Sequence, residues 1–161
     1  MKPCMLIVCA FVLATQLPAT PADTASLCMA MQSNTVFALP AARVERGIPV
    51  MQALKLRASA REYSDTALPL PVFADLLWAA SGVNRADSGK RTAPSAMNWQ
   101  EVDVYACTAD GVYRYLPKEH AIELVSSNDI RAATGTQPFV KDAAVNLVFV
   151  GNLDKVRGSD P

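Results

Sequence analysis

The chain has 161 residues, 51% of them apolar, which is enough for one globular domain with a buried core. Its 15 Lys and Arg residues balance its 15 Asp and Glu residues, so no bulk charge favours binding to nucleic acid or to an anionic membrane surface. The single histidine, His120, leaves little material for a histidine-based metal site or a Ser-His-Asp triad.

Residues 1–22 are typical of an export signal. Lys2 is their only charged residue, and a largely apolar run over 4–17 is followed by small residues. This run is shorter than the roughly 20 residues that span a bilayer, which favours cleavage after Ala22 over a membrane anchor. We therefore expect an exported protein, periplasmic or secreted, with no stable membrane span after cleavage.

Cleavage there would leave two cysteines, Cys28 and Cys107. They could pair in an oxidising compartment. However, Cys107 falls in a strand pattern, where it suits the role of a small buried apolar residue. Cys28 lies in the segment 23–47, which shows no periodicity and is expected to be a flexible lead-in. We therefore favour two free thiols.

The first predicted element is a short helix over 48–56, because Pro49 suits the first helical position and apolar residues follow at helical spacing. The next segment alternates, so that Arg57, Ser59 and Arg61 would project to one side of an extended chain. Two guanidinium groups and a hydroxyl could cradle a phosphate or the carbonyl oxygens of a ring. Alternatively, they form a solvated strip paired with Glu62 and Asp65.

A second helix is predicted over 71–82. It begins at Pro71, and its apolar residues recur at i, i+3, i+4 and i+7, which gives it a stripe that faces a core. Trp78 lies near the edge of this stripe and is expected to belong to the core. Gly82 can end the helix in a left-handed conformation.

A polar connector over 90–100 follows this helix. It carries two cations, several hydroxyl and amide side chains, and Pro94, which stiffens its backbone. A connector of this kind between two packed elements is a good position for ligand contact. We expect it to bind an anionic or heteroatom-rich ligand.

Beyond the connector the apolar pattern changes to a period of two, with an Asp-Gly turn, which predicts an antiparallel meander. The three predicted strands lie at 102–107, 112–116 and 120–125. His120 opens the third strand and is expected to be exposed and structural. A short helix is predicted through 129–133, with Ser126 or Ser127 as its cap. The apolar run 143–151 predicts a central strand buried on both faces.

Three of these stretches resemble, in order, motifs of the nitroreductase-like FMN-dependent oxidoreductases, especially the SagB-type dehydrogenase branch. Residues 57–63 are similar to R-x-S-x-R-x-F/Y, residues 76–85 to LLWAA-x-G-x-N-R, and residues 90–100 to (K/R)-R-T-x-P-S-A-x-N-x-Q. The resemblance implies an α+β fold with an antiparallel sheet flanked by helices. Because family members are longer, we expect residues 48–161 to be the N-terminal part of such a domain, incomplete at the C-terminus.

The resemblance also implies a homodimer that binds FMN at the subunit interface. Arg57 and Ser59 would hold the phosphate and ribityl end of FMN, and Arg61 would lie by the pyrimidine edge of the isoalloxazine ring. A cation at that edge stabilises the anionic reduced flavin.

The connector would supply the rest of the implied flavin site. Asn98 would hydrogen-bond the ring or the ribityl chain, and Pro94 and Ser95 would shape the wall beside it. The implied reaction transfers a hydride from NAD(P)H through FMN to a nitroaromatic, a quinone or a similar small acceptor. It requires neither a metal nor a catalytic side chain. The alternatives are a non-catalytic remnant or exported binding domain without flavin, and oxidation of azoline rings in peptides, as in the SagB-type branch.

Overall fold

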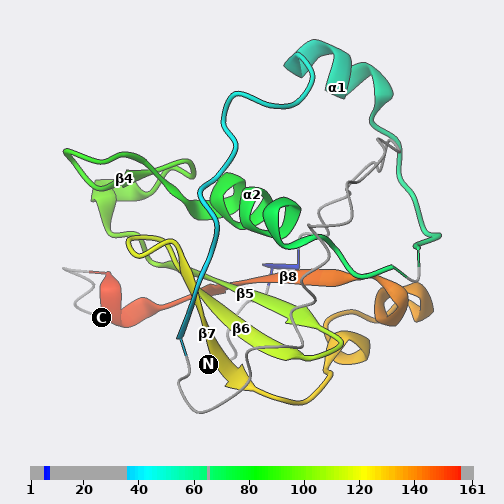
Figure 1. The fold of residues 1–161 in the computed structure, drawn as a ribbon. Helices are drawn as coiled ribbons and strands as arrows, with labels where there is room; N and C mark the ends of the chain where they lie inside the picture. Colours follow the sequence, from blue (N-terminus) through cyan, green and yellow to red (C-terminus); the bar gives the residue numbers. More distant parts are fainter. Residues whose placement is uncertain (1–5, 8–35, 65, 157–161) are drawn as a thin grey trace.

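The computed structural model describes residues 6–7, 36–64 and 66–156. Its main feature is a six-stranded sheet in the order β1-β8-β5-β6-β7-β2, in which every neighbouring pair is antiparallel (Figure 1). The strands of this sheet are β1 (Leu6–Ile7), β2 (Val36–Ala38), β5 (Val102–Thr108), β6 (Gly111–Leu116), β7 (Ala121–Ser126) and β8 (Val145–Gly151). The α+β fold with an antiparallel sheet is therefore confirmed.

The remaining elements lie around this sheet. A two-stranded ribbon pairs β3 (Val83–Arg85) with β4 (Lys90–Arg91). The helices are α1 (Val50–Leu56), α2 (Leu70–Ser81) and the 3-10 helices η2 (Ala96–Asn98), η3 (Arg131–Ala133), η4 (Pro138–Asp142) and η5 (Leu153–Lys155). Across the described residues, no helix is long and apolar enough to cross a membrane. The predicted export signal lies outside these residues except for β1.

The predicted meander is confirmed as β5, β6 and β7. Its first turn joins Thr108 to Gly111 through two residues, as the Asp-Gly signal indicates. Gly111 is required there for two reasons. Its φ of 143° is rarely adopted by residues with a side chain, and an added Cβ would lie 2.3 Å from the Ser126 carbonyl oxygen.

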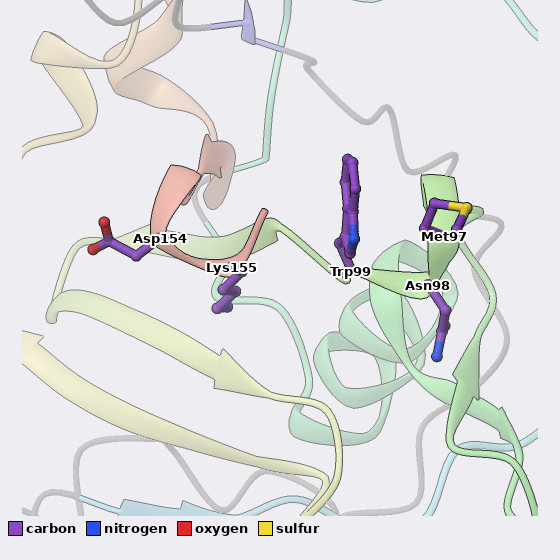
Figure 2. Close-up of a pocket in the computed structure, with 5 residues that line it drawn as sticks. All are labelled: Met97, Asn98, Trp99, Asp154 and Lys155. Carbon is purple, nitrogen blue, oxygen red and sulfur yellow. The ribbon is translucent and has the colours of Figure 1, made fainter. Parts of the chain in front are cut away.

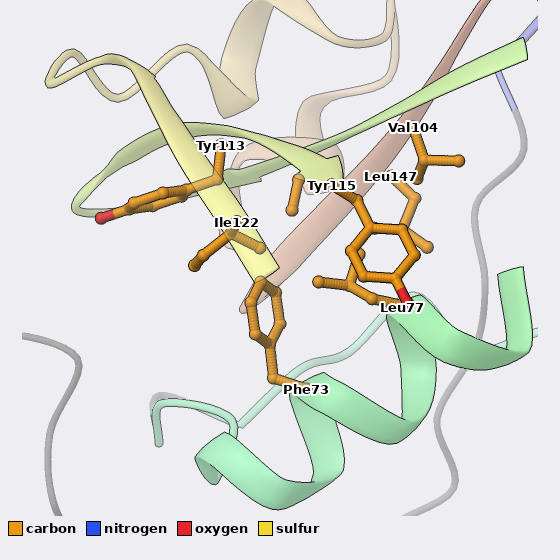
Figure 3. Close-up of a cluster of buried hydrophobic side chains, with 8 residues drawn as sticks. Phe73, Leu77, Val104, Tyr113, Tyr115, Ile122 and Leu147 are labelled. Atoms are coloured by element: carbon orange, nitrogen blue, oxygen red, sulfur yellow. The ribbon is translucent and has the colours of Figure 1, made fainter. Parts of the chain in front are cut away.

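The long helix α2 packs across one face of the sheet and builds the main core with it (Figure 3). Phe73 and Leu77 of α2 point at the side chains of the central strands. The buried partners are Val104, Ala106, Tyr113, Tyr115, Ile122 and Leu147. Leu77 has no exposed surface at all. The predicted apolar stripe is thus the face that holds α2 on the sheet.

The central strand β8 is covered on both faces in its middle, as predicted. Leu147 joins the α2 core, while Asn146 and Val148 are buried on the opposite face. There, the Asn146 amide donates to the Thr134 hydroxyl at 2.9 Å and to the Val140 carbonyl oxygen at 3.0 Å. Because Thr134 follows η3 and Val140 lies in η4, this buried amide fixes both 3-10 helices against the sheet.

The helix predicted through residues 129–133 is wrong: only the 3-10 helix η3 forms. Ser126, one of the two expected caps, closes a tight turn instead, because its Oγ accepts a hydrogen bond from the Asn128 amide. The Asp129 carboxylate accepts a similar local bond from the Arg131 amide. Local bonds of this kind compete with helix formation.

The left-handed cap predicted at Gly82 is also wrong, since its φ of −71° and ψ of 158° are extended. The chain passes directly from α2 into β3. The glycine is needed for space, because an added Cβ would lie 2.4 Å from Cδ1 of Trp78. The Trp78 indole is half-buried and its Nε1 donates to the Val83 carbonyl oxygen at 3.3 Å.

His120 has the predicted structural role, but it is half-buried and not exposed. Its Nε2 lies 2.9 Å from the Pro40 carbonyl oxygen and its Nδ1 lies 2.8 Å from the Tyr115 hydroxyl. A carbonyl can only accept, so Nε2 donates and Nδ1 accepts from Tyr115. His120 thereby holds the segment that follows β2, an edge strand that the sequence did not reveal.

Cys107 is a buried free thiol, as predicted. Its side chain packs with Val112 and Val148 on the face of the sheet opposite α2. Burial raises the pKa of this thiol, so it remains protonated at neutral pH. Cys28 lies outside the described residues.

We predict that Leu77→Ala destabilises the fold by about 2–5 kcal/mol, because it leaves a cavity between α2 and the sheet. Leu153→Ala is the matched control, since Leu153 is 77% exposed and should cost under about 0.5 kcal/mol. Urea unfolding followed by circular dichroism measures both. Equal costs for the two variants would contradict this account of the core.

Candidate functional site

The connector after β4 is anchored on the C-terminal end of α2. The Thr92 amide donates to the Gly82 carbonyl oxygen at 2.9 Å, and the Thr92 hydroxyl donates to the Trp78 carbonyl oxygen at 3.2 Å. The Gly82 amide also donates to the Trp78 carbonyl oxygen, at 2.7 Å, so Thr92 adds a second hydrogen bond at the end of the helix. These bonds fix where the rest of the connector lies.

Ser95 closes the connector on itself. Its hydroxyl donates to Glu101 Oε2 at 2.6 Å and accepts from the Gln100 amide at 2.7 Å. The bond from Ser95 lowers the pKa of the Glu101 carboxyl, so Glu101 is ionised at neutral pH. The Ser95 hydroxyl is thus committed to the loop, which is compatible with its predicted role in shaping a wall.

The tip of this loop has an unusual backbone. Met97, Asn98 and Gln100 have φ values of 51°, 56° and 53°, a left-handed region that costs residues with side chains about 1–3 kcal/mol each where it is strained. Strain of this kind is concentrated at functional sites, where the surrounding structure holds it. Here the closure by Ser95 and Glu101 holds it and leaves the Asn98 amide exposed.

An open depression of about 600 Å³ lies beside this tip. Met97, Asn98 and Trp99 line one side, and Asp154 and Lys155 of η5 line the other. Figure 2 shows the Trp99 indole standing between Met97 and Lys155. Lys155 Nζ bonds to Asp103 Oδ1 at 2.5 Å, which fixes η5 to the start of β5. The depression is large enough for part of a planar cofactor.

The other predicted group, Arg57, Ser59 and Arg61, lies on an exposed irregular segment. The Arg61 guanidinium lies 5.8 Å from the centre of the Phe139 ring, and Tyr63 contacts the same ring. Among the described residues, neither arginine forms an ion pair. The alternative of a strip paired with Glu62 is therefore not found. Asp65, the other candidate partner, lies outside the described residues.

The structure does not bring the two predicted groups together within one chain. The arginine segment precedes the N-terminal end of α2 and contacts η4, whereas Pro94, Ser95 and Asn98 belong to the loop anchored at its C-terminal end. A helix of 12 residues is about 18 Å long. Figure 1 shows the arginine segment descending from α1 on the side opposite β4.

Two residues near the loop were missed by the sequence analysis. Glu101 accepts the hydrogen bond that closes the loop, and Arg91 packs its guanidinium against Ser81. Arg91 belongs to the motif over residues 90–100, but the sequence analysis assigned it no specific role. Glu101 could not be identified, because no spacing rule predicts which acid a loop serine will reach.

A model of the nitroreductase family matches residues 54–161, which is more than half of the chain. The chain belongs to the nitroreductase family. A crystal structure of a protein assigned as a nitroreductase, from Ralstonia eutropha JMP134, matches with a TM-score of 0.73 and 37% sequence identity, over 98% of this chain and 69% of that chain. No curated protein matches the sequence. These matches support a nitroreductase-like oxidoreductase.

We predict that the Glu101 carboxyl titrates below its ordinary pKa of 4.5, because the Ser95 hydroxyl stabilises the charged form. Because this pKa is lowered in the folded state, the hydrogen bond from Ser95 to Glu101 stabilises the folded chain above pH 4.5. This contribution to the free energy of unfolding is lost as the pH falls through the lowered pKa. The chemical shift of the Gln100 amide proton against pH measures this titration. In Ser95→Ala the midpoint should rise toward 4.5, and an unchanged midpoint would contradict the assignment.

Proposed function

We propose that this chain is an FMN-dependent oxidoreductase that acts as a homodimer, with each flavin site shared between two copies. One observation carries the proposal. The arginine segment and the loop tip at Asn98 both present exposed polar side chains, but α2 holds them at opposite ends of one chain. A second copy, related by two-fold symmetry, can place the arginine segment of one subunit beside the loop of the other.

The arginine segment suits the phosphate end of FMN. Arg57 and Arg61 offer guanidinium groups that form no ion pair among the described residues, and Ser59 offers a hydroxyl between them. Guanidinium groups bind phosphate through paired hydrogen bonds. In this proposal Arg57 and Ser59 hold the phosphate and ribityl end, and Arg61 neutralises charge at the pyrimidine edge of the ring.

The loop suits the ring itself. The amide of Asn98 can donate to and accept from a flavin ring, and its left-handed backbone is held by the Ser95–Glu101 closure. Its Oδ1 accepts only a long bond of 3.2 Å from Gln100, so the amide can exchange this contact for a ligand. Pro94 adds a rigid wall beside Ser95.

Helix α1 supports the dimer. It has seven residues, and none of them is buried among the described residues. Met51 is 74% exposed and Leu54 is 58% exposed. A helix this short is not stable in water without packing, and an exposed apolar patch indicates an interface. A second copy that covers α1 would also contact Arg57, which follows the helix directly.

Bound FMN would accept a hydride and pass on electrons, so that the chain's own residues need only bind, orient and shield it. We propose NAD(P)H as the donor and a nitroaromatic, a quinone or a similar small molecule as the acceptor. The open depression beside Trp99 offers the acceptor an aromatic surface. We also propose that residues 1–22 direct export.

We predict that the full chain binds FMN and that both groups contribute. Arg61→Ala should weaken binding by about tenfold or more, because a charge-assisted hydrogen bond is worth about 1.5–3 kcal/mol. Asn98→Gly should also weaken binding, yet keep the stability of the loop, because glycine adopts the left-handed backbone without strain. Titration of FMN followed by quenching of flavin fluorescence measures both.

Arg46→Ala and Asn128→Ala are the matched controls, since both side chains are exposed and lie outside the two groups. They should leave FMN affinity unchanged. Failure of the wild-type chain to bind FMN would refute the proposal. It would favour the alternative of a binding domain without flavin.

A further inference from the structure

Arg91 carries a polar atom that the rest of the fold does not explain. Among the described residues, its Nε is the one buried side-chain nitrogen or oxygen without a hydrogen-bond partner. Its Nη1 makes two long contacts, at 3.3 Å to Ser81 Oγ and at 3.4 Å to the Val102 carbonyl oxygen. The Nε atom is therefore enclosed, while the residue as a whole is half-buried and the guanidinium is held loosely.

Such a group is costly for the fold. A buried donor without a partner loses its hydration and gains nothing in return, and the loss is larger for a charged group. Burial lowers the pKa of Arg91, although Asp103, Tyr115 and Glu101 act in the opposite direction. In native proteins an unsatisfied buried donor is rare and calls for an explanation, of which a bound water or ligand is one.

A cavity of about 160 Å³ lies against this guanidinium. Its apolar wall consists of Ala80, Ala93, Pro94, Val102, Val104 and Phe149. Its polar wall consists of Ser81, Arg91, Ser95, Gln100 and Glu101. At about 30 Å³ for each water, it has room for about five waters or for one small ring. The cavity thus combines an apolar surface with one unpartnered hydrogen-bond donor, the Nε of Arg91.

The charged side chains around the cavity determine whether a neutral or an anionic ligand is favoured. Glu101 lines it and is ionised, since Ser95 lowers its pKa, and Asp103 also acts on Arg91. Asp103 is already paired with Lys155, so Glu101 is the carboxylate that balances the cation within the cavity and disfavours a second anion there. A neutral oxygen, such as a carbonyl oxygen, can accept from Arg91 without that repulsion.

We propose that this cavity binds a small apolar ring carrying one neutral acceptor oxygen, and that Arg91 donates the hydrogen bond that fixes this oxygen. Because the contacts of Nη1 are long and therefore weak, the guanidinium can turn toward the ligand with little loss of hydrogen-bond energy. The cavity shares Pro94 and Ser95 with the proposed flavin site, but the proposal does not rest on flavin binding, because its test uses protein free of FMN.

The test compares three probes with the same number of non-hydrogen atoms: cyclohexanone, toluene and cyclobutanecarboxylate. Each is added to flavin-free, ¹⁵N-labelled full-length chain, and the Nε–H signal of Arg91 is followed by NMR. Cyclohexanone should shift this signal saturably, because Nε gains an acceptor. Toluene and cyclobutanecarboxylate should bind at least about tenfold more weakly, since one lacks an acceptor and the other carries a repelled charge.

Arg91→Lys assigns the signal, because it removes Nε but keeps the positive charge. Binding to this variant is followed through the backbone amide signals of Ser95 and Gln100, which line the cavity, and its affinity for cyclohexanone should fall at least about tenfold. Arg46→Lys is the exposed control and should change nothing. Three outcomes would overturn the proposal: no saturable shift in the wild-type chain, equal binding of the three probes, or unchanged cyclohexanone affinity in Arg91→Lys.

Discussion

The packing of α2 on the antiparallel sheet is the constraint on which the candidate site depends. Phe73 and Leu77 fill the space above the central strands and fix the helix rigidly. The arginine segment leads into the N-terminal end of α2, and the loop is anchored at the C-terminal end through Thr92. A rigid helix about 18 Å long cannot be bent to bring its ends together. The separation of the two groups therefore follows from the core.

This separation gives the exposed parts of the molecule a common explanation. Arg57 and Arg61 lack ion-pair partners among the described residues, α1 lacks buried side chains there, and Asn98 presents an amide on a strained backbone. The exposed apolar side chains of α1 and the left-handed backbone at Asn98 are unfavourable in an isolated chain, whereas water solvates the two arginines there. In a two-fold dimer they can be satisfied together, because α1 leads directly into the arginine segment. The proposed shared site thus accounts for both the polar and the apolar exposed surfaces.

The sequence predicted those parts of the fold that local patterns determine. The meander followed from period-two alternation and the turn at Gly111, and α2 followed from its apolar stripe. Strand β2 was missed because three residues at a sheet edge carry no measurable period. Gly82 was misassigned because a glycine after a helix usually supplies a left-handed cap, whereas here it makes room for Trp78. The packing of Trp78 against Gly82 cannot be predicted from the order of residues around the helix end.

The candidate site was predictable only in its composition. Its motifs predict which side chains would bind a flavin, but the arrangement of these side chains depends on the direction in which α2 crosses the sheet. The role of Glu101 depends in the same way on the folded loop, because Ser95 reaches it only after the left-handed turn at Asn98.

The most direct test of the shared site mixes two variants that each bind FMN poorly. Arg61→Ala and Asn98→Gly chains are unfolded together, refolded and titrated with FMN. If each site uses one group from each subunit, random pairing gives mixed dimers in which one site is intact, and about a quarter of all sites recover wild-type affinity. If mass spectrometry detects mixed dimers and no tight FMN binding returns, the two groups do not meet across a subunit interface.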